Sequence, residues 1–330
     1  MTADDSAARR RAWNEYWRAG PLHSLAGSFQ GNYEGPIRAF WEQAFAGLGA
    51  NDRVLDIGTG NGALPALLCE LRGADVPAID AIDIAAPDPA WLRQAPAPCR
   101  ERIRFHGDTP AEDTGFADAR FSLVASQYGL EYSDLARALP EVARITRAGG
   151  RLALVVHHAG SRLREVAAAE VGMIDWLLGP DGLMAPAAAI LPYVALAARG
   201  ERARLAADPG AGQARGRFNE AMQALEELAR ASPYPDALHD ARAQVGARID
   251  ALMRGAAGEA QAADAHAAHV RALQGARLRS LELCRHALDE AAARRLLAAL
   301  EQAGFTRAEA APLHHQEHLV GWTIRATRQA

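Results

Sequence analysis

The 330-residue sequence contains no lysine, and all 36 of its basic residues are arginine. This absence excludes reactions that need a lysine side chain, such as Schiff-base chemistry, anchoring of pyridoxal phosphate and phosphate binding by a Walker-type P-loop. The 36 arginines face 40 acidic residues, which gives a formal net charge of −4. Such a balance does not favour binding to nucleic acid or to an anionic membrane.

Cysteines and long apolar runs are also scarce. Cys69, Cys99 and Cys284 lie far apart without the spacing of a metal site, so we expect reduced thiols and a cytoplasmic protein. Residues 1–11 lack the apolar stretch of a secretory signal. The weakly polar run 182–198 contains two prolines and is shorter than the ~20 residues that cross a bilayer, so no transmembrane segment is predicted.

The spacing of apolar residues divides the chain into three regions. Residues 1–50 contain eight of the twenty aromatic residues and are expected to form an N-terminal helical segment. Residues 51–158 and 289–330 alternate short apolar strands with helices, which predicts an α/β fold with a Rossmann-like, seven-stranded, mostly parallel sheet. Residues 159–288 have almost no strand pattern, and we expect a large helical insertion after the fifth strand.

The most informative motif is a predicted strand that ends at Asp56 and runs into Gly58, Gly60 and Gly62. Glycines let a backbone turn sharply and let a ligand approach it closely. Together with Ala63, they also fit the dinucleotide fingerprint G-x-G-x-x-G/A, so the glycines alone leave the ligand open. Asp56 would repel a pyrophosphate, whereas it would attract a cofactor that has an amino group and no phosphate.

S-adenosylmethionine is such a cofactor, since it carries an ammonium and a sulfonium group. Asp83 ends the next predicted strand, 21 residues after Gly62, where a carboxylate can accept both ribose hydroxyls. With these features in order, the sequence resembles the class I S-adenosylmethionine-dependent methyltransferases over residues 50–158 and 289–328. The resemblance implies S-adenosyl-L-methionine as the cofactor.

The resemblance also implies roles for individual residues. The segment 106–109 matches the family's adenine-binding stretch, and the fourth strand ends over the cofactor at Gln127. Asp80 is a rival of Asp83 for the ribose, and the proline-rich segment 85–98 departs from the helix that usually follows the second strand. The implied cofactor residues are Asp56, Gly58, Gly60, Gly62, Asp83, Asp108, Thr109 and Gln127.

A general base assists methyl transfer to a hydroxyl or a thiol, and such a residue would lie where the fourth or fifth strand ends. His157 and His158 are the predicted alternatives, because histidine titrates near neutrality and strand neighbours point to opposite faces. Structural hydrogen bonding is the competing interpretation for both. Tyr128 is a third catalytic candidate, and Tyr128 and Tyr33 are candidates for the substrate pocket, with aromatic packing as the alternative. Glu131 and Tyr132 lie in the same region.

The sequence favours a small-molecule acceptor over a polymer. Family members that methylate nucleic-acid or protein amines carry a Pro-Pro step after the fourth strand, and this sequence has none. We therefore expect O- or N-methylation of a small molecule, as in natural-product tailoring. One alternative is an enzyme of the same fold that transfers or cyclises the aminobutyl chain and releases methylthioadenosine. Another is a catalytically inactive protein that binds S-adenosylmethionine and a protein partner.

The inserted helices and the C-terminal histidines each allow two interpretations. The inserted helices either cap the pocket as a lid or form the interface of a homodimer. His314, His315 and His318 have a spacing that can bind zinc, but we expect them in a solvated hairpin and predict no metal site.

Overall fold

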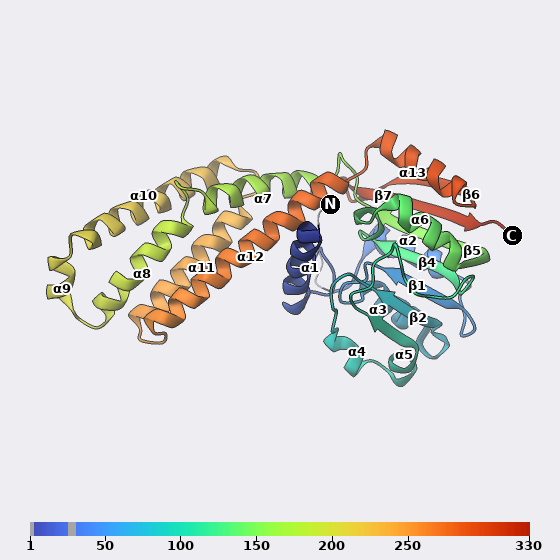
Figure 1. Ribbon diagram of the computed structural model, residues 1–330, viewed down its shortest axis with the longest axis horizontal. Helices are drawn as coiled ribbons and strands as arrows, with labels where there is room; N and C mark the ends of the chain where they lie inside the picture. Colours follow the sequence, from blue (N-terminus) through green and yellow to red (C-terminus); the bar gives the residue numbers. More distant parts are fainter. Residues whose placement is uncertain (1–2, 26–30) are drawn as a thin grey trace. The chain divides into compact units, whose positions relative to one another are not determined.

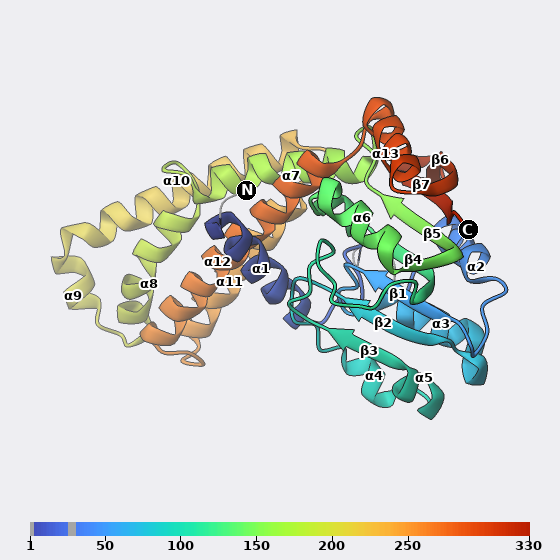
Figure 2. The same ribbon diagram turned by 45° about the vertical axis from the view of Figure 1, so that its right-hand side comes forward.

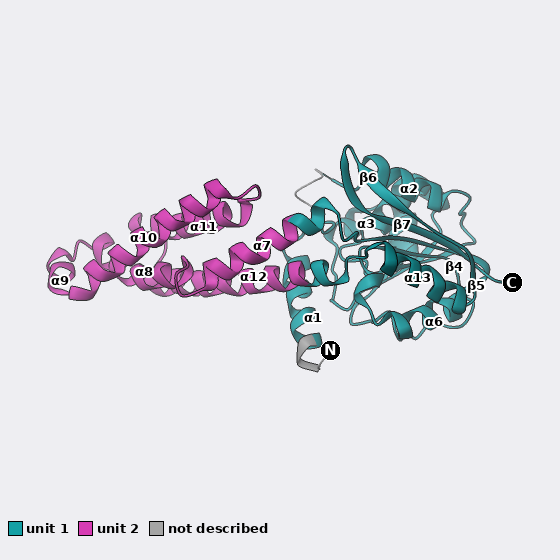
Figure 3. Cartoon of the chain, turned by 90° about the horizontal axis from the view of Figure 1, so that it is seen from above, with its two compact units in different colours: residues 1–165, 282–330 teal, residues 166–281 magenta. Residues whose placement is uncertain are grey.

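The computed structural model describes residues 3–25 and 31–330 (Figure 1). The chain forms two compact units, one made of residues 1–165 and 282–330 and the other of residues 166–281 (Figure 3). Within the described residues, no helix combines the length and the apolar character that crossing a membrane requires.

The first unit is built on a seven-stranded sheet with the order β3-β2-β1-β4-β5-β7-β6. Only β7 runs antiparallel to its neighbours, which confirms the predicted mostly parallel, Rossmann-like sheet (Figure 2). The strand order reverses between β1 and β4, and open α/β sheets bind ligands beyond the carboxyl ends of their strands at such a reversal. The strands are β1 Arg53–Ile57, β2 Ala78–Ile82, β3 Ile103–His106, β4 Phe121–Gln127, β5 Thr146–Val156, β6 Phe305–His315 and β7 His318–Arg328.

Helices cover both faces of this sheet. One buried cluster joins α2, α3 and α5 to side chains such as Ala125 and Val155, and the other joins α6 and α13 to Val124 and Leu154. Neighbouring strand residues thus enter opposite clusters, as strand geometry requires. The helices of this unit are α1 Ala3–Arg18, α2 Gly35–Phe45, α3 Ala63–Arg72, α4 Ala90–Gln94, α5 Ala97–Arg102, α6 Leu135–Ile145 and α13 Glu290–Gln302, with 3-10 turns η1 Gly73–Asp75 and η2 Leu130–Tyr132.

Two helix starts next to the site follow from their capping residues. Asp134 accepts the backbone N–H of Ala136 at the start of α6, and Asp289 accepts that of Ala292 at the start of α13. Such caps satisfy N–H groups that have no partner inside the helix. The proline-rich segment 85–98 contains α4 and the start of α5, so it does not form one regular helix.

The second unit is entirely helical, and its core is made of aliphatic side chains such as Ile174, Leu177, Leu225 and Leu238. α7 and α12 each begin or end in the first unit. The remaining helices lie wholly within residues 166–281. The bounds are α7 Arg162–Leu178, α8 Met184–Ala198, α9 Arg202–Ala207, α10 Pro209–Ala231, α11 Asp236–Met253 and α12 Glu259–His286.

The prediction that all cysteines are reduced thiols was wrong for two of the three. The structure joins Cys69 and Cys99 in a disulfide, whereas Cys284 is free. Cys69 belongs to α3 and Cys99 to α5, and both helices pack in the same buried cluster, which brings the two α-carbons within 5.9 Å. The 30-residue separation concealed a contact that only the packing of the two helices creates.

Candidate functional site

The loop between β1 and α3 carries the three motif glycines, and all three have positive φ: 69° at Gly58, 53° at Gly60 and 82° at Gly62. Residues with a β-carbon rarely adopt this conformation, so the loop requires glycine. A β-carbon at Gly58 would also lie 2.7 Å from the α-carbon of Gly129, which follows β4. The loops after β1 and β4 therefore pack backbone against backbone.

Aromatic rings occupy the space beside the other two motif glycines. The ring of Trp17, from α1, lies against Gly60, and the ring of Phe105, from β3, lies against Gly62. Asn61 donates from its side-chain amide to the backbone oxygen of Trp17 at 2.9 Å. The N-terminal helix is thus fixed directly on the glycine loop.

The two rival carboxylates, Asp80 in β2 and Asp83 just after it, have different surroundings. Asp83 is buried, and its two oxygens accept backbone N–H groups of the glycine loop and of the residue two positions on, each at 2.8 Å. Each oxygen keeps a second lone pair for a ligand. Asp80 instead pairs with His106 and with Arg120, both at 2.8 Å. The ion pair with Arg120 and the hydrogen bond with His106 occupy Asp80, whereas Asp83 lines the cavity described next.

A cavity of about 700 Å³ lies beyond the carboxyl ends of β1, β2, β3 and β4. Four of the predicted cofactor residues line it: Gly58, Asp83, Asp108 and Thr109. Asp108 is exposed with a φ of 53°, and its carboxylate lies 3.2 Å from Arg10 of α1. The backbone N–H of Thr109 donates to the backbone oxygen of Asp83 at 2.9 Å, which links the two loops that form this wall.

Asp56 and Gln127 do not line this cavity. Side chains alternate along β1, so Asp56, which is 2% exposed, lies on the opposite side from the cavity-lining Ile57. Among the described residues, Asp56 Oδ2 and Gln127 Nε2 have no hydrogen-bond partner, although Gln127 Oε1 accepts from the indole of Trp41 at 2.6 Å. Burial, with the charge of Asp83 acting in the same direction, raises the pKa of Asp56 to about 7.

The three predicted catalytic residues take part in aromatic packing. The ring of Tyr128 stacks on His157 with centroids 4.2 Å apart, and its hydroxyl donates to the backbone oxygen of Val320 at 3.0 Å. His158 stacks on Trp322 with centroids 4.5 Å apart. Burial lowers the pKa of His157 to about 3, so this ring is neutral and a weak base at neutral pH. None of the three lines the cavity.

Tyr33, the other predicted substrate residue, is buried in the same apolar cluster as Tyr128. Its ring stacks on His23 with centroids 4.6 Å apart. Burial, and to a smaller extent the nearby Tyr128 and Asp56, raises the pKa of Tyr33. The contacts of Tyr33 are therefore those of a core residue.

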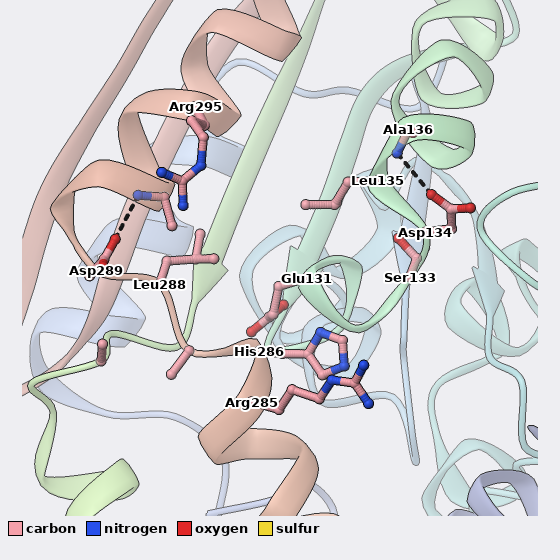
Figure 4. Close-up of a pocket in the computed structure, with 13 residues that line it drawn as sticks. Glu131, Ser133, Asp134, Leu135, Ala136, Arg285, His286, Leu288, Asp289 and Arg295 are labelled. Carbon is pink, nitrogen blue, oxygen red and sulfur yellow. Dashed lines mark hydrogen bonds between the residues drawn. The ribbon is translucent and has the colours of Figure 1, made fainter. Parts of the chain in front are cut away.

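A second hollow, of about 570 Å³, adjoins the first cavity (Figure 4). Both are lined by Ser133, Asp134, Arg285 and His286, so they share one wall. The hollow lies between the loop after β4, the end of α12 and the start of α13. Figure 4 draws Glu131 and His286 as neighbours at its inner end.

Glu131 is the most unusual group in this hollow. Its side chain is 3% exposed, one carboxylate oxygen accepts the backbone N–H of His157 at 3.0 Å, and the other has no partner among the described residues. Burial raises the pKa of Glu131 to about 8. A carboxyl group with such a pKa can exchange a proton with a ligand near neutral pH.

His286 lies beside Glu131 and lines both hollows. Its Nε2 is buried without a partner among the described residues, and burial lowers its pKa. Its ring packs against Tyr132 with centroids 5.2 Å apart. The position of Glu131 after the fourth strand was a signal for that residue. No sequence signal indicated His286, which ends a helix far along the chain.

One buried arginine fixes the N-terminal helix over this region. Arg9 of α1 donates to the backbone oxygen of Tyr132 at 3.0 Å and pairs with Glu282 of α12 at 2.5 Å. It connects α1, the loop after β4 and the end of α12.

The histidines of the C-terminal hairpin form a separate feature. His315 and His318 pair across the hairpin of β6 and β7. The described residues contain no group of three or more His, Cys, Asp or Glu side chains arranged to hold a metal ion.

Residues 55–154 match the family described as a methyltransferase domain. This match, over the part of the chain from β1 to β5, supports the resemblance to the class I S-adenosylmethionine-dependent methyltransferase superfamily. An uncharacterized methyltransferase of Mycobacterium tuberculosis is 37% identical over 158 residues, and so is one of Mycobacterium bovis. The alignment covers 47% of this chain and 59% of each relative, so the chain spans less than two thirds of the length of these relatives.

Solved structures with a similar fold include two methyltransferases. The 1,6-didemethyltoxoflavin-N1-methyltransferase of Burkholderia thailandensis is 22% identical, with a TM-score of 0.38 over 48% of this chain and 66% of that one. The geranyl diphosphate C-methyltransferase of Streptomyces coelicolor is 16% identical, with a TM-score of 0.35 over 47% of this chain and 65% of that one. These likenesses cover less than half of the chain, and they identify neither its acceptor nor its reaction.

Proposed function

We propose that the protein transfers a methyl group from S-adenosyl-L-methionine to a hydroxyl or amine of a small molecule. The observation that carries this proposal is the shared wall of two hollows. One is lined by four of the motif residues, Gly58, Asp83, Asp108 and Thr109, and the other by Glu131, whose second carboxylate oxygen is buried without a partner among the described residues. The shared lining residues make the two hollows adjacent, and alignment of a donor in one with an acceptor from the other would supply much of the rate of a displacement reaction.

The residues of the first cavity fit S-adenosylmethionine. Asp83 would accept the ribose hydroxyls, and Asp108 and Thr109 would lie at the adenine end, as the superfamily motifs imply. Asp56 does not line this cavity, so its buried carboxylate oxygen, which has no partner among the described residues, would meet the ammonium group of the cofactor only after the β1–α3 loop rearranges. When bound, this cofactor supplies a methyl group on a positively charged sulfur.

Glu131 is the residue best suited to remove a proton from the acceptor. Its raised pKa places the change between the acid and the base form near neutral pH, where a general base is most effective. The unpartnered carboxylate oxygen of Glu131 would accept the proton of the acceptor's hydroxyl or amine. The acceptor's own oxygen or nitrogen gains the methyl group in the same step. The amide hydrogen bond from His157 holds the carboxylate in place meanwhile.

The size of the second hollow supports a small acceptor. Its volume of about 570 Å³ lies in the range of pockets for drug-sized ligands, ~300–1,000 Å³. The net charge of −4 and the absence of lysine offer no surface pattern for a nucleic acid. We therefore propose a compact organic acceptor.

The test is an acceptor screen with the purified full-length protein and S-adenosylmethionine. A panel of small phenols, alcohols and amines is incubated with the protein, and S-adenosylhomocysteine and methylated products are followed by mass spectrometry. We expect stoichiometric formation of both with at least one acceptor, and their loss in Asp83→Ala. Release of methylthioadenosine in place of S-adenosylhomocysteine would contradict methyl transfer. Cofactor binding without turnover across the panel would favour an inactive binding protein.

A further inference from the structure

The helical unit of residues 166–281 contains a hollow of its own, with a volume of about 930 Å³. It lies along α11 and α12, and its wall includes ten alanines together with Ile174 and Leu273. Small apolar side chains leave room for a ligand and offer it no hydrogen bonds. The wall is therefore suited to the hydrocarbon part of a ligand.

The most buried charged side chain in this wall is that of Arg248 in α11, which is 9% exposed. Its guanidinium lies 2.6 Å from Nδ1 of His269, and among the described residues no carboxylate forms an ion pair with it. Arginine is always charged in proteins, and it can only donate hydrogen bonds. The partner of this buried positive charge is therefore a neutral imidazole, and the charge is not balanced within the unit.

The nearby histidines do not supply a negative charge. Burial and the charge of Arg248 lower the pKa of both His266 and His269, so both rings are neutral at neutral pH. His269 must carry its proton on Nε2, because Nδ1 accepts from Arg248. His266 is 7% exposed, and its Nδ1 has no partner among the described residues.

The acidic residues of the wall form no ion pair with Arg248 among the described residues. Glu170 accepts a hydrogen bond from the hydroxyl of Ser280, and Asp240 is exposed to solvent. A second arginine, Arg279, lines the same hollow. Buried charges in proteins are normally paired, so an anion that is absent from the chain itself would complete this site.

We propose that this hollow binds a small organic anion, with its carboxylate or phosphate on Arg248 and its apolar body against the alanine wall. The volume fits a ligand of this class, since ligand pockets span ~300–1,000 Å³. A planar guanidinium matches the oxygen pairs of carboxylates and phosphates. The site lies within one unit and does not depend on the methyl transfer proposed above.

Calorimetric titration of the full-length protein tests the site with three probes of equal chain length, used below their micelle concentrations: octanoate, octyl phosphate and octanol. We expect the anions to bind at least about tenfold more tightly than octanol, which corresponds to one charge-assisted contact of ~1.4 kcal/mol or more. The tighter of the two anions identifies the head group. Equal binding of octanol, or no binding of either anion, would overturn the proposal.

Three variants assign the binding to this hollow. Arg248→Gln should abolish the preference for anions, whereas the matched control Arg271→Gln, an exposed arginine of α12 outside the hollow, should keep it. Ala268→Phe places a large side chain at an exposed position of the wall and leaves Arg248 in the sequence. It should weaken the binding of all three probes. Since Arg248→Gln removes an unbalanced buried charge, its unfolding midpoint without ligand should not fall. Unchanged anion binding in both Arg248→Gln and Ala268→Phe would refute the assignment.

Discussion

One carboxylate oxygen of Glu131 accepts the backbone N–H of His157, and the other oxygen is buried without a partner among the described residues. The first contact fixes the side chain, and the second oxygen remains available to a ligand. A fixed carboxyl group with a pKa of about 8 is suited to proton transfer, whereas His157, with a pKa of about 3, is not. Glu131 is therefore better suited than His157 to act as the general base.

Replacement of this carboxyl group by an amide should slow the reaction. Once an acceptor is known, Glu131→Gln is expected to lower kcat by ~10²–10⁴-fold, the usual contribution of a general base. KM should change much less, since the amide keeps the shape of the side chain. The wild-type rate should rise with pH up to about 8, and this rise should disappear in the variant. A parallel loss in kcat with an unchanged pH profile would indicate a structural role instead.

The buried acids should also make stability depend on pH. Burial raises the pKa of Glu131 to about 8 and that of Asp56 to about 7. At a pH between the ordinary pKa of such an acid and its raised pKa, the folded protein therefore keeps a proton that the unfolded chain has released. Raising the pH therefore favours unfolding, by up to ~1.4 kcal/mol per pH unit for each proton. The histidines with lowered pKa values act in the opposite direction, because the unfolded chain still protonates them around their ordinary value of 6.5, and this opposing effect fades above about pH 7.5.

Urea unfolding at about pH 7.5, 8.0 and 8.5, above the range in which the histidines titrate, measures this effect. The free energy of unfolding should fall across this range in the wild type and fall less steeply in Glu131→Gln. A wild-type protein whose stability is constant or rises over the range would contradict the assigned burial of these acids.

The different surroundings of Asp80, in β2, and Asp83, just after β2, predict different defects: one in stability and the other in cofactor binding. Asp83→Asn should weaken binding of S-adenosylhomocysteine at least about tenfold, because hydrogen bonds to a charged group contribute ~1.5–3 kcal/mol each. Asp80→Asn is the matched control, and it should lower stability through the loss of the ion pair with Arg120 and a weaker hydrogen bond with His106, while binding stays nearly unchanged. Calorimetric titration of both variants with S-adenosylhomocysteine compares their affinities. A stronger binding defect in Asp80→Asn would reverse the assignment of the two carboxylates.

The contact between α1 and the glycine loop can be measured as a coupling energy. Gly60→Ala places a β-carbon at a positive φ, which costs ~1–2 kcal/mol, and also directs it at the ring of Trp17. In a Trp17→Ala background the second cost disappears, so the same substitution should destabilise less. Denaturant unfolding of the two single variants and the double variant gives the coupling. Additive effects would mean that the helix does not pack on the loop in solution.

Much of the fold followed from local patterns in the sequence. The strand before Gly58 and the helix after it form a unit of sequential elements, and the alternation of strands and helices fixes a parallel sheet. The positive φ values of Gly58, Gly60 and Gly62 explain why this motif was visible in the sequence. The choice between Asp80 and Asp83 was not decidable, because it depends on ion pairs with β3 and with Arg120.

The second hollow depends on contacts between distant segments, and these leave no periodic signal. His286 reaches Glu131 from a helix that ends 155 positions later in the chain. The Cys69–Cys99 disulfide likewise depends on the packing of two short helices. His157 and His158 follow the end of β5, and the sequence pattern does not reveal that each stacks on an aromatic ring, since those rings come from other segments.

The most direct test of the central claim is the fate of S-adenosylmethionine. The purified protein is incubated with the cofactor alone and then with an accepted small molecule, and the nucleoside products are identified by mass spectrometry. Methyl transfer predicts an unchanged cofactor in the first reaction and S-adenosylhomocysteine, matched by methylated acceptor, in the second. Methylthioadenosine formed without any acceptor, and lost in Asp83→Ala, would contradict it.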